Sequence, residues 1–123
     1  MAKKVLLVEN EEDIIGILQK RFVKEGYEFL SAREGEEGFR KIEETRPDLV
    51  LLDIGILQLG GFEIMERIAR KPDLKEIPVI VISNSGRSEE IKKAKDLGTK
   101  DWIIKTEFDP QDVVGKVIKQ IGK

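Results

Sequence analysis

The chain has 123 residues, the size of one ordinary domain, and its 40% hydrophobic content is enough for one core. The 22 basic residues nearly balance the 24 acidic ones, so a net charge of −2 argues against direct nucleic-acid binding. No apolar run approaches the roughly 20 residues that a membrane helix needs, and the N-terminal apolar stretch is too short for a signal peptide, so we expect a cytoplasmic protein without membrane association.

Two reactive residue types are missing, because the sequence contains no cysteine and no histidine. Their absence excludes disulfides, thiol nucleophiles, zinc sites built from Cys and His, and any catalytic triad that uses histidine. Chemistry in this chain therefore has to rest on carboxylates, amides, hydroxyls and lysines.

Short apolar runs of strand length alternate with segments of helical periodicity along the whole chain. In chain order we predict strand 3–8, helix 13–26, strand 27–32, helix 35–47, strand 48–53, helix 61–72, strand 77–83, helix 88–98, strand 101–105 and helix 109–121. This alternation predicts a single α/β domain over residues 1–123, in which five parallel strands form a doubly wound sheet with helices on both faces.

Polar side chains stand at the ends of four of the predicted strands. Open parallel sheets place ligands at the carboxyl ends of their strands, where the strand order reverses. Glu9 and Asn10 follow the first strand, Asp53 ends the third, Ser83 ends the fourth and Lys105 ends the fifth. Asp53 is unusual even by itself, because an acid that closes a fully apolar strand needs a partner.

This ordered set resembles the response-regulator receiver domain, and the resemblance covers the whole chain through "LLVEN", "LLDIG", "VISN" and "DWIIKT". It implies the flavodoxin-like strand order 2-1-3-4-5. It also implies that Asp53 accepts a phosphoryl group, which Lys105 and Ser83 then contact. Trp102 stands at the family's aromatic position, three residues before the lysine, and with Ser83 it is the expected switch.

A divalent cation is expected at this site, because a negatively charged phosphoryl group that approaches a carboxylate must be neutralised. Mg²⁺ prefers oxygen ligands and is commonly held by one or two carboxylates. Glu9, Asn10 and Asp53 supply such oxygens, and the resemblance implies the backbone carbonyl of Gly55 as a further ligand. Residues 11–13, by contrast, are expected to be solvated acids in the first turn of a helix.

Five positions depart from the common family pattern: Glu9, Asn10, Leu57, Gly60 and Thr106. Glu9 is one methylene longer than the usual Asp, and Asn10 removes one negative charge from the expected cation site. Leu57 and Gly60 replace the usual Pro and Asp of the loop after the acceptor. Thr106 replaces the usual Pro after the lysine, so an ordinary trans peptide bond is expected before it. These changes bear on metal affinity and phosphorylation efficiency rather than on the fold.

The resemblance implies a stand-alone receiver of a two-component phosphorelay, and not an enzyme. A sensor histidine kinase or phosphotransfer protein would be the phosphodonor. A downstream protein would bind the face formed by the fourth helix, fifth strand and fifth helix. We expect Lys105 at a solvent-facing strand end, where it can pair with a phosphoryl oxygen.

Parts of the pattern also fit three other functions. The first is a degenerate receiver, a phosphorylation-independent interaction module, which Asn10 and Thr106 favour. The second is a phosphohydrolase with an Asp nucleophile, but such enzymes carry a second acid where this chain has Gly55. The third is a flavodoxin-like electron carrier, which needs a phosphate-binding loop after the first strand, whereas the acidic "ENEED" would repel a phosphate.

Overall fold

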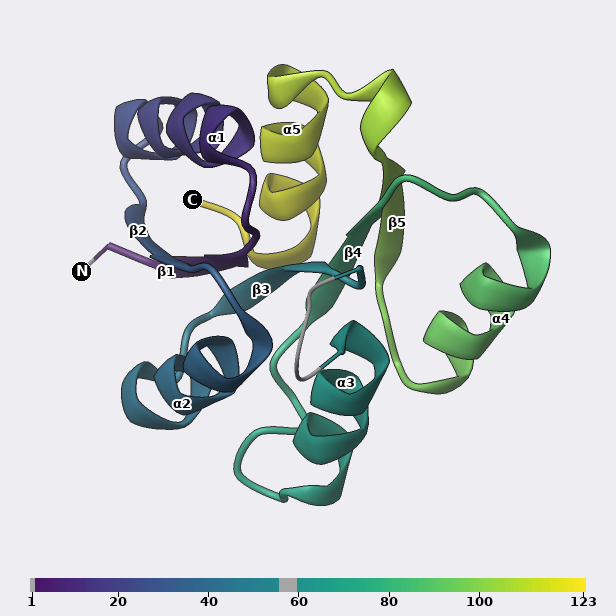
Figure 1. The fold of residues 1–123 in the computed structure, drawn as a ribbon. Helices are drawn as coiled ribbons and strands as arrows, with labels where there is room; N and C mark the ends of the chain where they lie inside the picture. The colour runs from purple at the N-terminus through teal and green to yellow at the C-terminus, as the bar shows by residue number, and fades with distance from the viewer. Residues whose placement is uncertain (1, 56–59) are drawn as a thin grey trace.

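Strands and helices alternate through the whole molecule (Figure 1), and the computed structural model describes residues 2–55 and 60–123. The strands are β1 (Lys4–Val8), β2 (Glu28–Ala32), β3 (Leu49–Asp53), β4 (Val79–Ser83) and β5 (Asp101–Ile104). The helices are α1 (Glu12–Lys24), α2 (Gly35–Thr45), α3 (Gly61–Arg70), α4 (Ser88–Asp96) and α5 (Pro110–Ile121), and a 3₁₀ turn spans Lys105–Glu107. Each predicted element is present, and no end differs from its prediction by more than two residues.

The five strands form one parallel sheet in the order β2-β1-β3-β4-β5, which confirms the predicted topology. The strand order reverses between β1 and β3, which lie side by side although β2 comes between them in the sequence. The register pairs Val8 with Leu52, Asp53 with Ile82 and Ser83 with Ile104. The carboxyl ends of β1, β3, β4 and β5 therefore meet at one edge of the sheet.

The core has two halves, one on each face of the sheet, and Figure 1 shows α1 and α5 on one face and α2 and α3 on the other. Successive strand residues alternate between the halves, so Leu51 joins the side of α1 and α5 while Leu52 joins the opposite side. All five residues of β3 and all five of β4 are buried, as their continuous apolar runs predict.

The helix ends follow local backbone signals. Helix α1 stops before Gly26 and α4 before Gly98, and both glycines have positive φ angles, of 94° and 98°. Helix α5 begins with Pro110, and the Asp109 carboxylate accepts a hydrogen bond of 2.9 Å from the backbone N–H of Gln111. Within residues 2–55 and 60–123 no peptide bond is cis, so the expected trans bond before Thr106 is confirmed. No helix of the described chain has both the length and the apolar character required to span a bilayer.

The start of α3 packs tightly against the chain that leaves β3. Gly61 lies so close to Ile54 that a Cβ atom built on the glycine would lie 2.4 Å from the Ile54 Cα atom. Gly60 is the N-cap of α3 and offers no side-chain acceptor to the helix, unlike the Asp that the family usually has there. Leu57, the other departure in this loop, lies outside the described residues. The close approach at Gly61 fixes the backbone directly after Asp53.

We predict that Gly61→Ala lowers the free energy of unfolding by about 1–3 kcal/mol, because the added methyl group collides with backbone that cannot move without shifting the strand end. The matched control is Gly115→Ala on the exposed side of α5, where an added Cβ meets nothing within 4 Å. That control should gain about 0.5–1 kcal/mol from the better helix propensity of alanine. Urea denaturation of both variants measures the two effects, and equal behaviour would contradict the packing described for Gly61.

Candidate functional site

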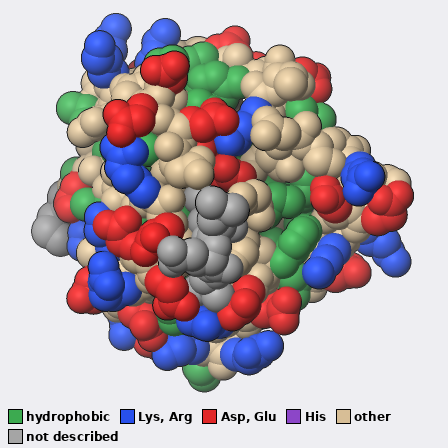
Figure 2. Space-filling view, viewed as in Figure 1, with side chains coloured by type: hydrophobic (Ala, Val, Ile, Leu, Met, Phe, Trp, Pro, Cys, Tyr) green, Lys and Arg blue, Asp and Glu red, His purple; other side chains and the backbone are tan. Residues whose placement is uncertain are grey.

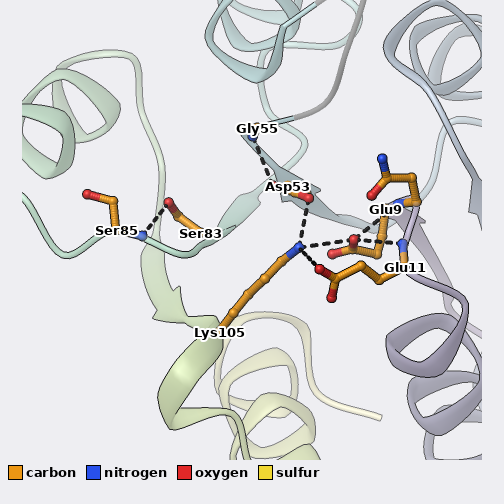
Figure 3. Close-up of polar contacts among 8 residues, drawn as sticks. Glu9, Glu11, Asp53, Gly55, Ser83, Ser85 and Lys105 are labelled. Carbon is orange, nitrogen blue, oxygen red and sulfur yellow. Dashed lines mark hydrogen bonds and ion pairs between the residues drawn. The ribbon is translucent and has the colours of Figure 1, made fainter.

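Asp53 lies at the end of the central strand, 6% exposed, where its carboxylate makes two polar contacts. Its Oδ1 atom accepts a hydrogen bond of 2.9 Å from the backbone N–H of Gly55. Its Oδ2 atom accepts one of 2.9 Å from the Lys105 ammonium (Figure 3). The partner that this acid requires is therefore a lysine from β5's end, two strands away in the sheet.

Glu9 is the second acid of the site, and it is completely buried. Its Oε2 atom accepts hydrogen bonds from the backbone N–H groups of Asn10 and Glu11, at 3.1 and 3.0 Å, and from Lys105 Nζ at 3.1 Å. Its Oε1 atom is also buried, and it has no hydrogen-bond partner in the described part of the chain. A buried carboxylate oxygen without a donor is costly, so this atom is available to a further ligand.

Lys105 holds the two acids together. Its ammonium lies 2.9 Å from Asp53, 3.1 Å from Glu9 and 3.7 Å from Glu11 (Figure 3). The side chain is only 7% exposed, so the expectation of a solvent-facing lysine is wrong. The physical reason is that the ammonium is attracted by two buried carboxylates, those of Glu9 and Asp53, and pairs with both.

The pKa values of Glu9 and Lys105 show the competition between burial and pairing. Burial raises the pKa of Glu9 above its ordinary value, the nearby Asp53 charge raises it further, and the hydrogen bonds from Glu11 and Lys105 offset only part of the rise. Burial opposes the charged form of Lys105, but hydrogen bonds to Asp53 and Glu9 outweigh it and leave the lysine pKa raised. The ammonium is therefore firmly charged and Glu9 is the strained member of the cluster.

A second polar path runs from β4 to β5. The Ser83 hydroxyl oxygen, on a residue that is 5% exposed, accepts a hydrogen bond of 3.0 Å from the Ser85 N–H. The Ser85 carbonyl in turn accepts a hydrogen bond of 2.9 Å from the indole N–H of Trp102. Because Ser83 uses its oxygen as an acceptor here, its hydroxyl proton remains free to donate.

Asp53 and Ser83 share a pocket of about 220 Å³ at the edge of the sheet. Besides these two residues its lining comes from the loops after β3 and β4 and the first turns of α3 and α4: Ile54, Gly55, Phe62, Asn84, Ser85 and Glu90. The pocket is lined partly by backbone and hydroxyl groups that can donate hydrogen bonds. It is roomy enough for a phosphoryl group and several waters, since one water occupies about 30 Å³ in the liquid.

The structure brings Glu9, Asp53 and Lys105 into direct contact and places Ser83 in the pocket beside Asp53. Asn10 is exposed, and its backbone N–H donates to Glu9, while its side-chain amide has no hydrogen-bond partner in the part of the chain that the structure describes. Gly55 lies next to Asp53 through its N–H group.

Two residues of the site were not singled out from the sequence. Glu11 was expected to be a solvated helix-start acid, but it is the residue before α1, and its half-exposed carboxylate reaches Lys105. Glu90 has no assigned role within the predicted helix 88–98, but it lines the Asp53 pocket and its Oε1 atom is buried. Adjacency to Glu9 is a signal that could have found Glu11, whereas nothing in the local pattern marks Glu90.

The oxygen donors of the site suit a hard cation such as Mg²⁺. Within the described residues no three acidic side chains are arranged to hold a metal ion, so a cation here depends on two carboxylates and on neutral oxygens. Such a ligand set is typical of Mg²⁺ sites, because the ion retains several waters and needs only one or two carboxylates from the protein. The unpartnered Oε1 atom of Glu9 is the specific observation in favour of such an ion.

Comparison with known proteins points to one family. The family model described as "Response regulator receiver domain" matches residues 5–118. The alkaline phosphatase synthesis transcriptional regulatory protein PhoP of Bacillus subtilis (strain 168) is 32% identical over 119 residues, which are 95% of this chain and 48% of PhoP. Response regulator GtcR of Aneurinibacillus migulanus is 29% identical over 123 residues, 100% of this chain and 49% of GtcR. The chain thus spans about half the length of these curated relatives.

Solved structures of similar fold come from several signalling proteins. Chemotaxis response regulator CheY4 of Vibrio cholerae has a TM-score of 0.89 at 23% identity, over 97% of this chain and 98% of that chain. The phosphorylated cyanobacterial phytochrome response regulator RcpA has a TM-score of 0.88 at 28% identity, over 98% of this chain and 94% of that chain. A third similar structure is the receiver domain of sensor histidine kinase PA1611 from Pseudomonas aeruginosa PAO1, which is described with a magnesium ion in its active site cleft. Its TM-score is 0.87 at 20% identity, over 100% of this chain and 100% of that chain.

We predict that Glu9→Gln raises the melting temperature of the metal-free protein at pH 7. The pKa of Glu9 is raised in the folded state, so its protonation favours folding and its ionisation above the ordinary pKa costs stability. The advantage of the variant should therefore grow as the pH rises from below 4.5 through the raised pKa, and shrink at lower pH. Melting curves from pH 3.5 to 7.5 in the presence of a chelator measure it. A pH-independent difference would contradict the raised pKa.

Proposed function

The chain belongs to the response regulator receiver family, and from that premise we propose that it accepts a phosphoryl group on Asp53 in two-component signalling. The observation that carries the proposal is the Lys105 ammonium at 2.9 Å from Asp53, at the carboxyl ends of the strands. A nearly buried carboxylate beside a fixed cation and an open pocket is suited to receive an anionic group.

In the proposed reaction the Asp53 carboxylate attacks the phosphorus of a phosphohistidine. A new P–O bond forms while the P–N bond breaks, and the bonding electrons return to the imidazole nitrogen of the donor. The chain has no histidine of its own, so the phosphohistidine comes from a partner, which we propose is a sensor histidine kinase or phosphotransfer protein. Lys105 then pairs with a phosphoryl oxygen while it keeps its contact with Glu9.

We propose that Mg²⁺ is held by Glu9, Asp53, the Asn10 amide and the backbone carbonyl of Gly55. The free Oε1 atom of Glu9 supports this assignment. Bound Mg²⁺ would neutralise the negative charge that gathers between the Asp53 carboxylate and the phosphoryl group. Glu9 and Asp53 would orient the ion, and Lys105 would balance the remaining charge.

The proposed switch uses the hydrogen bonds that link Ser83, Ser85 and Trp102. The free hydroxyl proton of Ser83 can be donated to a phosphoryl oxygen on Asp53 across their common pocket. A shift of Ser83 toward that oxygen pulls on the Ser85 N–H, and the Ser85 carbonyl holds the Trp102 indole. Phosphorylation would thereby change the position of Trp102 on the surface of β5.

The proposed output is binding of a downstream protein to the face made by α4, β5 and α5. Trp102 lies between two hollows on this face, one of about 200 Å³ toward α5 and one of about 370 Å³ toward α4. In the view of Figure 2, green hydrophobic side chains lie between the centre of the molecule and the projecting lobe at the right, where Figure 1 places α4. A displaced Trp102 would reshape both hollows together. Stand-alone action of this receiver stays a prediction.

A degenerate receiver is the alternative, and the replacement of acid by Asn10 and of Pro by Thr106 is its support. The contact of Asp53 with Lys105 and the donor capacity of Ser83 weigh against it, because a module that no longer takes phosphate does not need them. The same experiment decides between the two.

We predict that acetyl phosphate with Mg²⁺ adds one phosphoryl group to the wild-type chain and none to Asp53→Asn. The asparagine keeps the shape and the hydrogen bond from Gly55 but is not a nucleophile. Intact-mass spectrometry measures the addition directly.

The control is Asp48→Asn, which alters an exposed acid just before β3, at the opposite end of the strand, where Asp48 accepts a hydrogen bond of 2.7 Å from the Lys4 backbone N–H. It should be phosphorylated like wild type. An unmodified wild-type chain would support the degenerate receiver, and a modified Asp53→Asn chain would place the acceptor elsewhere.

We predict that Asn10→Asp tightens Mg²⁺ binding about tenfold, because the variant adds one carboxylate within a few ångströms of the proposed ion. The gain is limited to this size because solvent screens most of the Coulomb attraction. It should also lower the melting temperature of the metal-free protein, since a further negative charge lies near Glu9 and Asp53. Calorimetric titration and melting curves test both effects. Gln19→Glu, which adds the same charge on the exposed surface of α1, should change neither, and an unchanged affinity in Asn10→Asp would remove Asn10 from the metal site.

A further inference from the structure

Glu90 is the acid of the Asp53 pocket that the proposed phosphorylation does not use. It lies in the first turn of α4 and lines the pocket with Asp53, Ser83 and Phe62. Its Oε1 atom is buried, and it accepts no hydrogen bond from any described residue. A buried carboxylate oxygen without a donor is costly, and a turn of the side chain into the adjoining pocket would bring it to a water.

The cations nearest in the fold are already engaged. Lys105 is bonded to Asp53 and Glu9. Lys93, one turn along α4 from Glu90, places its ammonium over the ring of Phe62, 4.4 Å from the centroid. Among the residues that the structure describes, none forms an ion pair with Glu90. Its carboxylate therefore lines the same pocket as Asp53 without an ion-pair partner among the described residues.

We propose that Glu90 positions and deprotonates the water that hydrolyses phosphorylated Asp53, and so sets the lifetime of the signalling state. The water oxygen forms a new bond to phosphorus while the P–O bond to Asp53 breaks, and Asp53 leaves as a carboxylate. The water proton passes to the Glu90 carboxylate and is later released to solvent, so the products are inorganic phosphate and the original receiver.

The arrangement of the pocket supports this role. Asp53 enters it from the end of β3, Glu90 enters from α4, and the space between them has a volume of about 220 Å³. Attack on an aspartyl phosphate has to come from the side of phosphorus that faces away from the Asp53 oxygen. A base carried on a different element from the acceptor can reach that side, whereas Glu9 is bonded to Lys105, and Lys105 is bonded to Asp53 itself.

The inference rests on the proposed phosphorylation of Asp53, and the experiment separates the two. The full chain is phosphorylated with acetyl phosphate and Mg²⁺, the donor is removed by rapid desalting, and loss of the phosphoryl group is followed by intact mass. Wild type, Glu90→Gln and Glu89→Gln are compared. Glu89 is the exposed neighbour in the same helical turn, so its variant removes the same charge without touching the pocket. Circular dichroism melting verifies that each variant is folded.

We expect the phosphorylated state of Glu90→Gln to last about tenfold longer than that of wild type, because the amide can still hold the water but cannot take its proton; a complete general base is worth roughly a hundredfold or more. Glu89→Gln should match wild type. Equal lifetimes in the two variants would overturn the assignment of Glu90. Failure of wild type to become phosphorylated would instead overturn the proposed function.

Charge repulsion is the competing explanation for a longer lifetime, and beryllofluoride distinguishes it. This anionic phosphoryl mimic binds at equilibrium and involves no proton transfer. If Glu90 acts as a base, beryllofluoride with Mg²⁺ should bind wild type and Glu90→Gln with affinities equal within about twofold. A rise in affinity as large as the gain in lifetime would show repulsion alone and would overturn the proposal.

Discussion

The contact of one buried ammonium with the carboxylates of Glu9 and Asp53 is the interaction on which the rest of the site depends. The two acids come from neighbouring strands, and at this depth two adjacent negative charges repel each other strongly and are poorly hydrated. Lys105 neutralises the pair and joins the ends of β1, β3 and β5 through side chains. The metal-free site is thus partly neutralised, so the proposed cation or phosphoryl group would rearrange contacts that already exist.

In the proposed cation site, Asn10 stands where the family usually has an acid, so the proposed site has one negative charge fewer. Two carboxylates, Glu9 and Asp53, face one ammonium, Lys105, so the buried cluster is only partly neutralised before any ligand arrives. Glu11 adds a third carboxylate, but its side chain is 53% exposed and its interaction with Lys105 is weakened by solvent. If the proposed ligand set is correct, a neutral Asn10 favours the stability of the metal-free site over tight cation binding.

Much of this molecule could be predicted from the sequence, because the relevant signals are local. Apolar runs and helical periodicity specify β3, β4 and their flanking helices, and the parallel alternation brings Glu9, Asp53, Ser83 and Lys105 to one edge. The burial of Lys105 could not be predicted in this way, since it depends on carboxylates that are distant in sequence. The position of Glu90 depends on how the loop after β4 aims the first turn of α4, and periodicity does not describe that direction.

Trp102 is the sole tryptophan of the chain, and its indole N–H is bonded to the Ser85 carbonyl. Indole emission depends on the polarity and hydrogen bonding of the ring's surroundings, so the protein carries a built-in optical probe at the junction of the loop after β4 with β5. Every photon emitted by tryptophan comes from this one position. The intrinsic fluorescence of the unlabelled protein is therefore a direct, real-time record of the state of that junction.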